Sequence, residues 1–397
     1  MAAESISAGT QKRIGGAVCR SCRIGDCMEQ RNREVDFLRF VFAVIIMLHH
    51  SRYVLGDENC LFLGGSLAVE FFFIVSGYLM MASILRAERR QSAGVTRAAL
   101  GTETYHFLLR KIRAFLPEYL IAWFIGFFLI EGFGFPGLRH VLHDFGKYFF
   151  ELSLIKMSGI FTGGIDGCMW YLSAMLLCMA VLYPLIRRHK NFMVHIGAPL
   201  TALFLLGYLC RTFGHPRDPV EWTGLVYKGD LRAMAELCLG VVAFYAAARL
   251  RMLRLTKPAH ILIRLAGTGI YTAVIFYMYK EDPSTADYFY IFLLLIAVIF
   301  TFSGQGAGSG LFDKPAAAKL TQFCAKYSTA LYFSHLYFAQ HINNVLTPAH
   351  YSGRLRMTVY VAVSLLNGLL VLLLAGCWRK HGKKLTAALR RFLIAQA

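Results

Sequence analysis

The stretch RFVFAVIIMLHHS, residues 39–51, is apolar enough for a membrane helix, yet it begins with Arg39 and ends with His49 and His50. Hydrocarbon accommodates ionisable side chains only at a high free-energy cost, so such residues within a span usually mark function. Comparable apolar runs lie near residues 35–55, 66–86, 115–132, 169–186, 193–212, 231–250, 260–279, 287–303, 322–346 and 357–378. Since these runs are about as long as a bilayer is thick, we expect an all-α polytopic membrane protein of about ten transmembrane helices.

Composition supports a membrane protein. Hydrophobic residues make up 57% of the chain and charged residues 16%, whereas about 25% is typical of soluble domains. Of the 42 Lys and Arg residues, 28 fall in one alternating set of loops and tails and 11 in the other set. Because cytoplasmic loops carry the excess of Lys and Arg, both termini are predicted to be cytoplasmic. The basic loops have no interleaved aromatic residues that would favour nucleic-acid binding.

Three segments follow from these runs. Residues 1–33 form a polar cytoplasmic tail that we expect to be disordered, residues 34–378 a membrane domain, and residues 379–397 a basic cytoplasmic tail. The half-apolar stretch 140–161 is predicted to be interfacial or re-entrant. The N-terminal tail contains Cys19, Cys22 and Cys27 without a fourth ligand nearby, so we expect no metal site there.

The first span places two polar side chains on one face. Arg39 and His50 are eleven residues apart, which is about three full helical turns and about 16 Å along the axis. Asp36 precedes Arg39 by one turn and can pair with it. Taken alone, the pattern also fits an Arg39 that snorkels to the headgroups and a His50 that lies at the interface.

Five motifs follow one another along the chain: REVDFLRFVFAVIIMLHHS (33–51), GGSLAVEFFFIVSGYLM (64–80), RKIRAFLPEY (110–119), MWYLSAMLLCMAVLYPL (169–185) and YSTALYFSH (327–335). In this order they resemble the acyltransferase-3 family of membrane carbohydrate O-acyltransferases. The first resembles the family's basic residue, ten intervening residues and then His, which Arg39 and His50 match, and the second its acidic residue before FFxxSG. Some members carry a Glu in the Trp-led helix, where this chain has Met175.

The resemblance implies an acyl-CoA-dependent O-acyltransferase. Cytoplasmic acyl-CoA, most often acetyl-CoA, is then the donor, and a carbohydrate hydroxyl is the acceptor. Arg39, Arg110 and Arg113 are expected to hold the CoA phosphates, since arginine binds phosphate by bidentate, charge-assisted bonds. His50 is expected to act as general base on the hydroxyl or to carry the acyl group itself.

Other candidates have two open interpretations. Glu70 either assists His50 in catalysis or binds the acceptor, unless it is only a carboxylate at a helix end. Trp170, with Tyr332 and His335, is expected to bind the acceptor, although Trp170 also fits an aromatic belt and His335 a structural hydrogen bond. Ser76 is expected to bond its own helix backbone. Arg232 and Glu236, four residues apart, are expected to pair.

We therefore expect transfer of an acetyl or other acyl group to a cell-surface polysaccharide or a lipid-linked glycan in the bacterial inner membrane. The partners are then acyl-CoA, the carbohydrate and the lipid bilayer, and a homo-oligomer is compatible with the sequence. The alternative is a transporter or exporter of a small solute or glycan that uses the same intramembrane polar residues. Transporters often show repeated halves and broken helices, and no internal repeat is evident here.

Overall fold

The computed structural model describes residues 31–94, 98–131, 137–160, 164–306, 312 and 314–395. The protein is 81% helical, and the described residues form no strand, which confirms the all-α fold. The expected tail at residues 1–30, with its three cysteines, lies outside the described residues.

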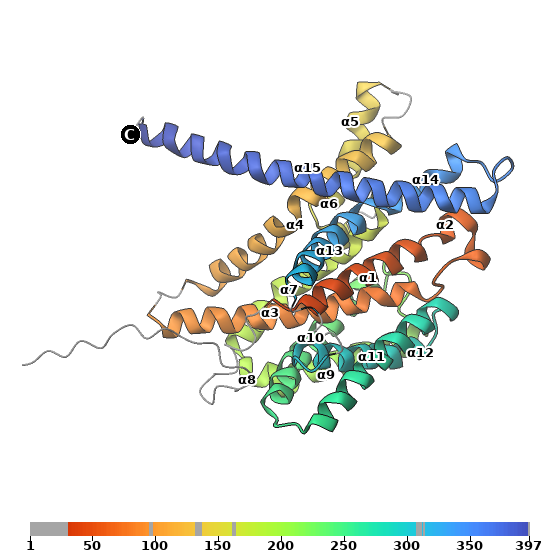
Figure 1. Ribbon diagram of the computed structural model, residues 1–397. Coiled ribbons are helices and arrows are strands. Elements are labelled where there is room, and N and C mark those ends of the chain that lie inside the picture. The colour runs from red at the N-terminus through yellow and green to blue at the C-terminus, as the bar shows by residue number, and fades with distance from the viewer. Residues whose placement is uncertain are drawn as a thin grey trace, which may run out of the picture.

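Eight helical segments of the described chain are long and apolar enough to cross a membrane: Arg33–Leu55, Gly65–Ser92, Leu100–Ile130, Gly167–Arg188, Lys190–Phe213, Lys228–Met252, Lys257–Lys280 and Gly353–Gly382. Their main helices are α1 (Arg33–His49), α3 (Ala68–Ser92), α4 (Leu100–Ile130), α7 (Trp170–Arg188), α9 (Ala198–Phe213), α10 (Lys228–Met252), α11 (Lys257–Lys280) and α15 (Gly353–Ala395). The chain is an integral multi-pass membrane protein. α15 continues past the expected last span as far as Ala395, so most of the expected C-terminal tail is helical (Figure 1).

The other two expected spans have distinct forms. The run 287–303 forms α12 (Ala286–Phe302), a helix of 17 residues. The run 322–346 is split at His335 into α13 (Pro315–Ser334) and α14 (Leu336–Val345). α13 packs against α1, α4 and α15 (Figure 1), so the broken helix lies inside the bundle, where its interruption has protein neighbours.

The closest helix pair is α3 with α10, and glycines make the approach possible. A Cβ on Gly77 would lie 2.1 Å from the carbonyl oxygen of Leu237, and one on Gly240 would lie 2.3 Å from that of Ile74. Small residues let membrane helices approach backbone to backbone. α10 also contacts α7, α9 and α12, so it forms the centre of one half of the bundle.

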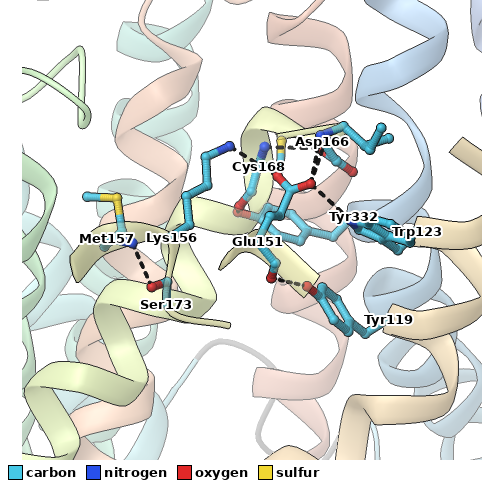
Figure 2. A network of polar contacts seen from close by, with 10 residues as sticks. Tyr119, Trp123, Glu151, Lys156, Met157, Asp166, Cys168, Ser173 and Tyr332 are labelled. Atoms are coloured by element: carbon cyan, nitrogen blue, oxygen red, sulfur yellow. Dashed lines mark hydrogen bonds and ion pairs between the residues drawn. The ribbon is translucent and has the colours of Figure 1, made fainter. Parts of the chain in front are cut away.

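The segment between α4 and α7 consists of short helices around one buried carboxylate. They are α5 (Leu138–Lys147), α6 (Phe149–Leu152), η4 (Lys156–Ser158) and η5 (Gly167–Met169). Glu151 accepts hydrogen bonds from Trp123 Nε1 at 3.0 Å, from the Ile165 amide at 2.7 Å and from Lys156 Nζ at 3.0 Å (Figure 2). These bonds hold the segment that leads into α7. Cys168 lies in this segment, in η5, and Trp170 is the first residue of α7.

Candidate functional site

Two cavities lie along α1, one toward each of its ends. The first has a volume of about 320 Å³, and we call it the histidine cavity. It lies among the C-terminal end of α1, the start of α3, the start of α7 and the break between α13 and α14. Its wall includes His49, His50, Tyr53, Lys156, Cys168, Trp170, Arg217, Arg232, Tyr332 and Gln340.

The second cavity has a volume of about 730 Å³ and is lined by five Lys and Arg side chains, so we call it the basic cavity. It lies among the N-terminal half of α1, the middle of α3 and α4, and the C-terminal half of α13. Its wall includes Arg31, Arg39, Lys111, Lys326 and Arg379, the carboxylates Asp36 and Glu118, and apolar and aromatic side chains.

The two cavities share part of their lining. Val69 of α3 and Tyr332 of α13 line both of them. Arg39 therefore lies in one cavity and His50 in the other, at the two ends of the face of α1 that the sequence predicted. The two cavities therefore adjoin at Val69 and Tyr332.

His50 and His335 are directly hydrogen bonded. His50 Nδ1 lies 3.0 Å from His335 Nε2, and His335 Nδ1 lies 3.0 Å from the carbonyl oxygen of Leu331. A carbonyl only accepts, so His335 carries its proton on Nδ1 and its Nε2 accepts from His50. A neutral His50 then carries its proton on Nδ1 and has a free lone pair on Nε2. The backbone of α13 thus sets the tautomer of the residue expected to be catalytic.

Cys168 is a third polar group beside the two histidines. Its Sγ lies 3.8 Å from His335 Nε2. Its amide donates to Asp166 Oδ1 at 2.9 Å, and its carbonyl accepts from the Tyr332 hydroxyl at 3.0 Å (Figure 2). Burial and the Glu151 carboxylate raise the pKa of Asp166 from 3.8 to about 8. No pattern in the sequence pointed to this thiol, because only the fold brings residues 50, 168 and 335 together.

Glu70 is buried in an ion pair with Arg232, and no hydrogen bond joins it to His50 among the described residues. The Arg232 guanidinium lies over the Trp170 ring, 5.2 Å from its centroid. The expected pairing of Arg232 with Glu236 is therefore replaced by a bond to Glu70 from the neighbouring helix. Through Arg232, Glu70 supports the wall of the histidine cavity next to Trp170.

The three expected phosphate-binding arginines do not come together. Arg39 lines the basic cavity, whereas Arg110 and Arg113 are exposed and lie outside its wall. Lys111 lines the cavity instead, because Lys111, Phe115 and Glu118 follow the spacing of one helix face. That spacing was visible in the sequence and would have favoured Lys111.

The structure also shows the surroundings of Asp36, of Ser76 and of the expected acceptor ligands. Asp36 pairs with Arg31, which is the cation preceding α1, and no bond to Arg39 is found among the described residues. The Ser76 hydroxyl lies 3.2 Å from the Tyr171 hydroxyl, so it reaches across to α7 and not only to its own backbone. Among the expected acceptor ligands, Trp170 and Tyr332 line the histidine cavity, and His335 lies behind His50.

A comparison with protein families matches residues 32–376 to an acyltransferase domain, which covers nearly the whole chain. The chain belongs to the acyltransferase-3 family. Comparison with curated proteins and with solved structures found no match. The family assignment makes the protein a membrane acyltransferase, and the two cavities along α1 form its candidate site.

Proposed function

We propose that the protein transfers an acyl group, acetyl first among the candidates, from cytoplasmic acyl-CoA to a hydroxyl of a carbohydrate on the other side of the membrane. The observation that carries this proposal is the pair of adjoining cavities: basic side chains line one, His50 lines the other, and Val69 and Tyr332 line both. The predicted topology puts the basic cavity on the cytoplasmic side, where acyl-CoA is found. The membrane is then the bacterial inner membrane.

The basic cavity supports CoA as the donor. Arg39, Lys111 and Lys326 offer cationic donors for phosphates, whereas Arg379 is paired with Glu118; charge-assisted bonds are about twice as strong as neutral ones. The extended arm of CoA would then run along α1 toward the shared wall at Val69 and Tyr332. This arrangement brings the thioester to His50 while the phosphates stay with the cations.

The histidine cavity supports a carbohydrate as the acceptor. Trp170 and Tyr53 offer aromatic faces, and Gln340, Lys156 and Asp218 offer polar groups for hydroxyls. Such a mixture of aromatic surface and a few polar groups is typical of sites for small polar ligands. The acceptor would be part of a cell-surface polysaccharide or a lipid-linked glycan.

His50 is suited to the role of general base. Its Nε2 accepts the proton of the acceptor hydroxyl, and the hydroxyl oxygen attacks the thioester carbonyl carbon. The new C–O bond forms as the C–S bond breaks, and the CoA thiolate leaves with the proton from His50. His335 accepts from Nδ1 and stabilises the imidazolium as it forms, so charge on His50 remains hydrogen bonded throughout.

The experiment is acyl transfer from radiolabelled acetyl-CoA by the purified protein in detergent, with release of free CoA and label on protein both followed. His50→Ala is expected to abolish CoA release and to keep acetyl-CoA binding. His341→Ala is the control. The His341 ring bonds the Tyr337 carbonyl and lines neither cavity. Label trapped on the wild-type protein would favour a covalent acyl-His50 route over direct transfer.

Two outcomes would contradict the proposal. CoA release by His50→Ala at the wild-type rate would remove His50 from the reaction. Wild-type protein that binds no acetyl-CoA would favour a transporter or exporter of a small solute or glycan, for which movement of the solute needs no acyl donor.

A further inference from the structure

Three groups that ligate transition metals meet at the histidine cavity. The ligand atoms of His50, His335 and Cys168 all lie within 4.8 Å of one another. The distance from His50 Nδ1 to His335 Nε2 is 3.0 Å, and that from His335 Nε2 to Cys168 Sγ is 3.8 Å. Tetrahedral zinc with ordinary bond lengths separates such atoms by about 3.3 to 3.6 Å. The two stated distances therefore need shifts of a few tenths of an ångström, and the third pair, His50 and Cys168, needs to close by about 1.2 Å at most.

We propose that His50 Nδ1, His335 Nε2 and Cys168 Sγ form a binding site for a thiophilic divalent cation, Zn²⁺, and that its occupancy blocks acyl transfer. One thiolate and two imidazoles are ligands that favour zinc over magnesium or calcium. The inhibitory consequence rests on the function proposed above, whereas the metal site itself does not.

The surroundings already orient two of the ligands. His335 Nδ1 donates to the Leu331 carbonyl, which turns the Nε2 lone pair toward the cluster, as is typical of metal-bound histidines. Cys168 is held through its backbone by Asp166 and Tyr332. His50 and Cys168 line the cavity, so a fourth coordination position would open toward it.

Zinc binding has a defined effect on His50. Cys168 loses its thiol proton to solvent as the Zn–S bond forms, so one proton is released for each cation bound. His50 binds through Nδ1, and its ring proton moves to Nε2, since a neutral imidazole carries one proton. The lone pair that faces the acceptor hydroxyl disappears, and His50 no longer acts as a base or as a nucleophile.

The test measures zinc binding directly, by equilibrium dialysis of tag-free protein in detergent against Zn²⁺. Cys19, Cys22 and Cys27 are replaced by Ser in every sample, so that they take no metal. One Zn²⁺ per chain is expected, with affinity at least about tenfold lower in Cys168→Ser and in His335→Ala. Cys178→Ser is the control, because Cys178 is a buried thiol of α7 that bonds the Asp230 carbonyl and lies outside the cluster.

Cobalt substitution and an activity assay complete the test. A thiolate-to-Co²⁺ charge-transfer band is expected in the Cys178→Ser protein and is lost in Cys168→Ser. Equal zinc affinity and equal spectra in these two variants would overturn the site. Zinc that binds but leaves acyl transfer unchanged, or speeds it, would overturn the inhibitory role. If the metal-free protein shows no acyl transfer, the proposed function fails, and the dialysis and the cobalt spectrum still decide the metal site.

Discussion

His335 accepts a hydrogen bond from His50 across the bundle, over a distance of 3.0 Å, and lies at the one-residue break between α13 and α14. The break places the His335 ring at the C-terminal end of α13. There its Nδ1 donates a hydrogen bond to the Leu331 carbonyl. A backbone carbonyl thus sets the state of His335, and His335 sets that of His50. The tautomer of the expected base is built into the fold.

His335→Ala is expected to lower kcat for acyl transfer by roughly 10- to 100-fold, within the range for acid–base groups, because His50 loses the acceptor that orients it. The KM for acyl-CoA is expected to stay near the wild-type value, since His335 lies outside the basic cavity. Steady-state kinetics with acetyl-CoA measure both quantities.

His335→Gln is the informative companion, because a glutamine amide oxygen offers His50 an acceptor. It is expected to retain more activity than His335→Ala. Equal losses in both variants, or a loss confined to KM, would contradict an orienting role for His335.

Removing one member of the buried Glu70–Arg232 pair is expected to destabilise the protein strongly. Glu70→Ala removes the carboxylate bonded to Arg232 and leaves Glu236 as its remaining acidic neighbour, at a cost of up to about 3 to 5 kcal/mol. The double variant Glu70→Gln, Arg232→Met removes both charges and is expected to unfold at a higher temperature than Glu70→Ala. Thermal unfolding in detergent measures the difference. An unchanged midpoint in Glu70→Ala would show that the pair contributes little to stability.

The motif glycine Gly77 is expected to be required for packing. Gly77→Ala places a methyl group where the Leu237 carbonyl lies, so α3 and α10 have to separate and the unfolding temperature falls. Gly269→Ala is the control, since a Cβ there meets no atom within 4 Å. Equal unfolding temperatures for the two variants would contradict the close α3–α10 contact.

Stability is expected to fall with rising pH because of Asp166. Its folded pKa of about 8 lies above the ordinary 3.8, so the folded protein holds the proton more tightly. This stabilisation is complete below about pH 4 and is lost as the pH rises to about 8, by up to about 1.4 kcal/mol per pH unit. Asp166→Asn removes the titration and keeps an acceptor for Cys168. The unfolding temperature of wild type relative to this variant is expected to drop between pH 5 and 8, and parallel curves would contradict the assignment.

The sequence predicted the fold well where the pattern was local. Apolar runs identified the eight membrane spans, and the eleven-residue separation of Arg39 and His50 was enough to place the two side chains at opposite ends of one face. The break at His335 was not predicted, because residues 331–339 continue an apolar pattern around it and no Pro or Gly marks the interruption.

Contacts between distant segments could not be predicted from the sequence. Glu70 meets Arg232 only when α3 packs against α10, and Cys168 meets His335 only when η5 packs against the end of α13. Arg39 and His50 lie in adjoining cavities, and Arg110 and Arg113 lie outside both. The roles expected for these residues stay predictions.

For binding of the acyl donor, the residues expected from the sequence differ from those that line the basic cavity. Lys111 lines it and Arg110 is exposed beside it, although both belong to the same motif. Lys111→Ala is expected to weaken acetyl-CoA binding by about tenfold, the effect of losing roughly 1.4 kcal/mol from one bond to a charged group. Arg110→Ala removes an exposed charge and is expected to change the affinity less than twofold at 0.15 M salt, where such charges are screened.

Equilibrium binding of labelled acetyl-CoA to the two variants, and to Arg39→Ala, measures these effects without requiring an acceptor. Arg39→Ala is expected to lose affinity as Lys111→Ala does, because both side chains face the same cavity. A larger loss in Arg110→Ala than in Lys111→Ala would contradict this arrangement and would place the phosphates on the exposed face of α4, as the motif alone had suggested.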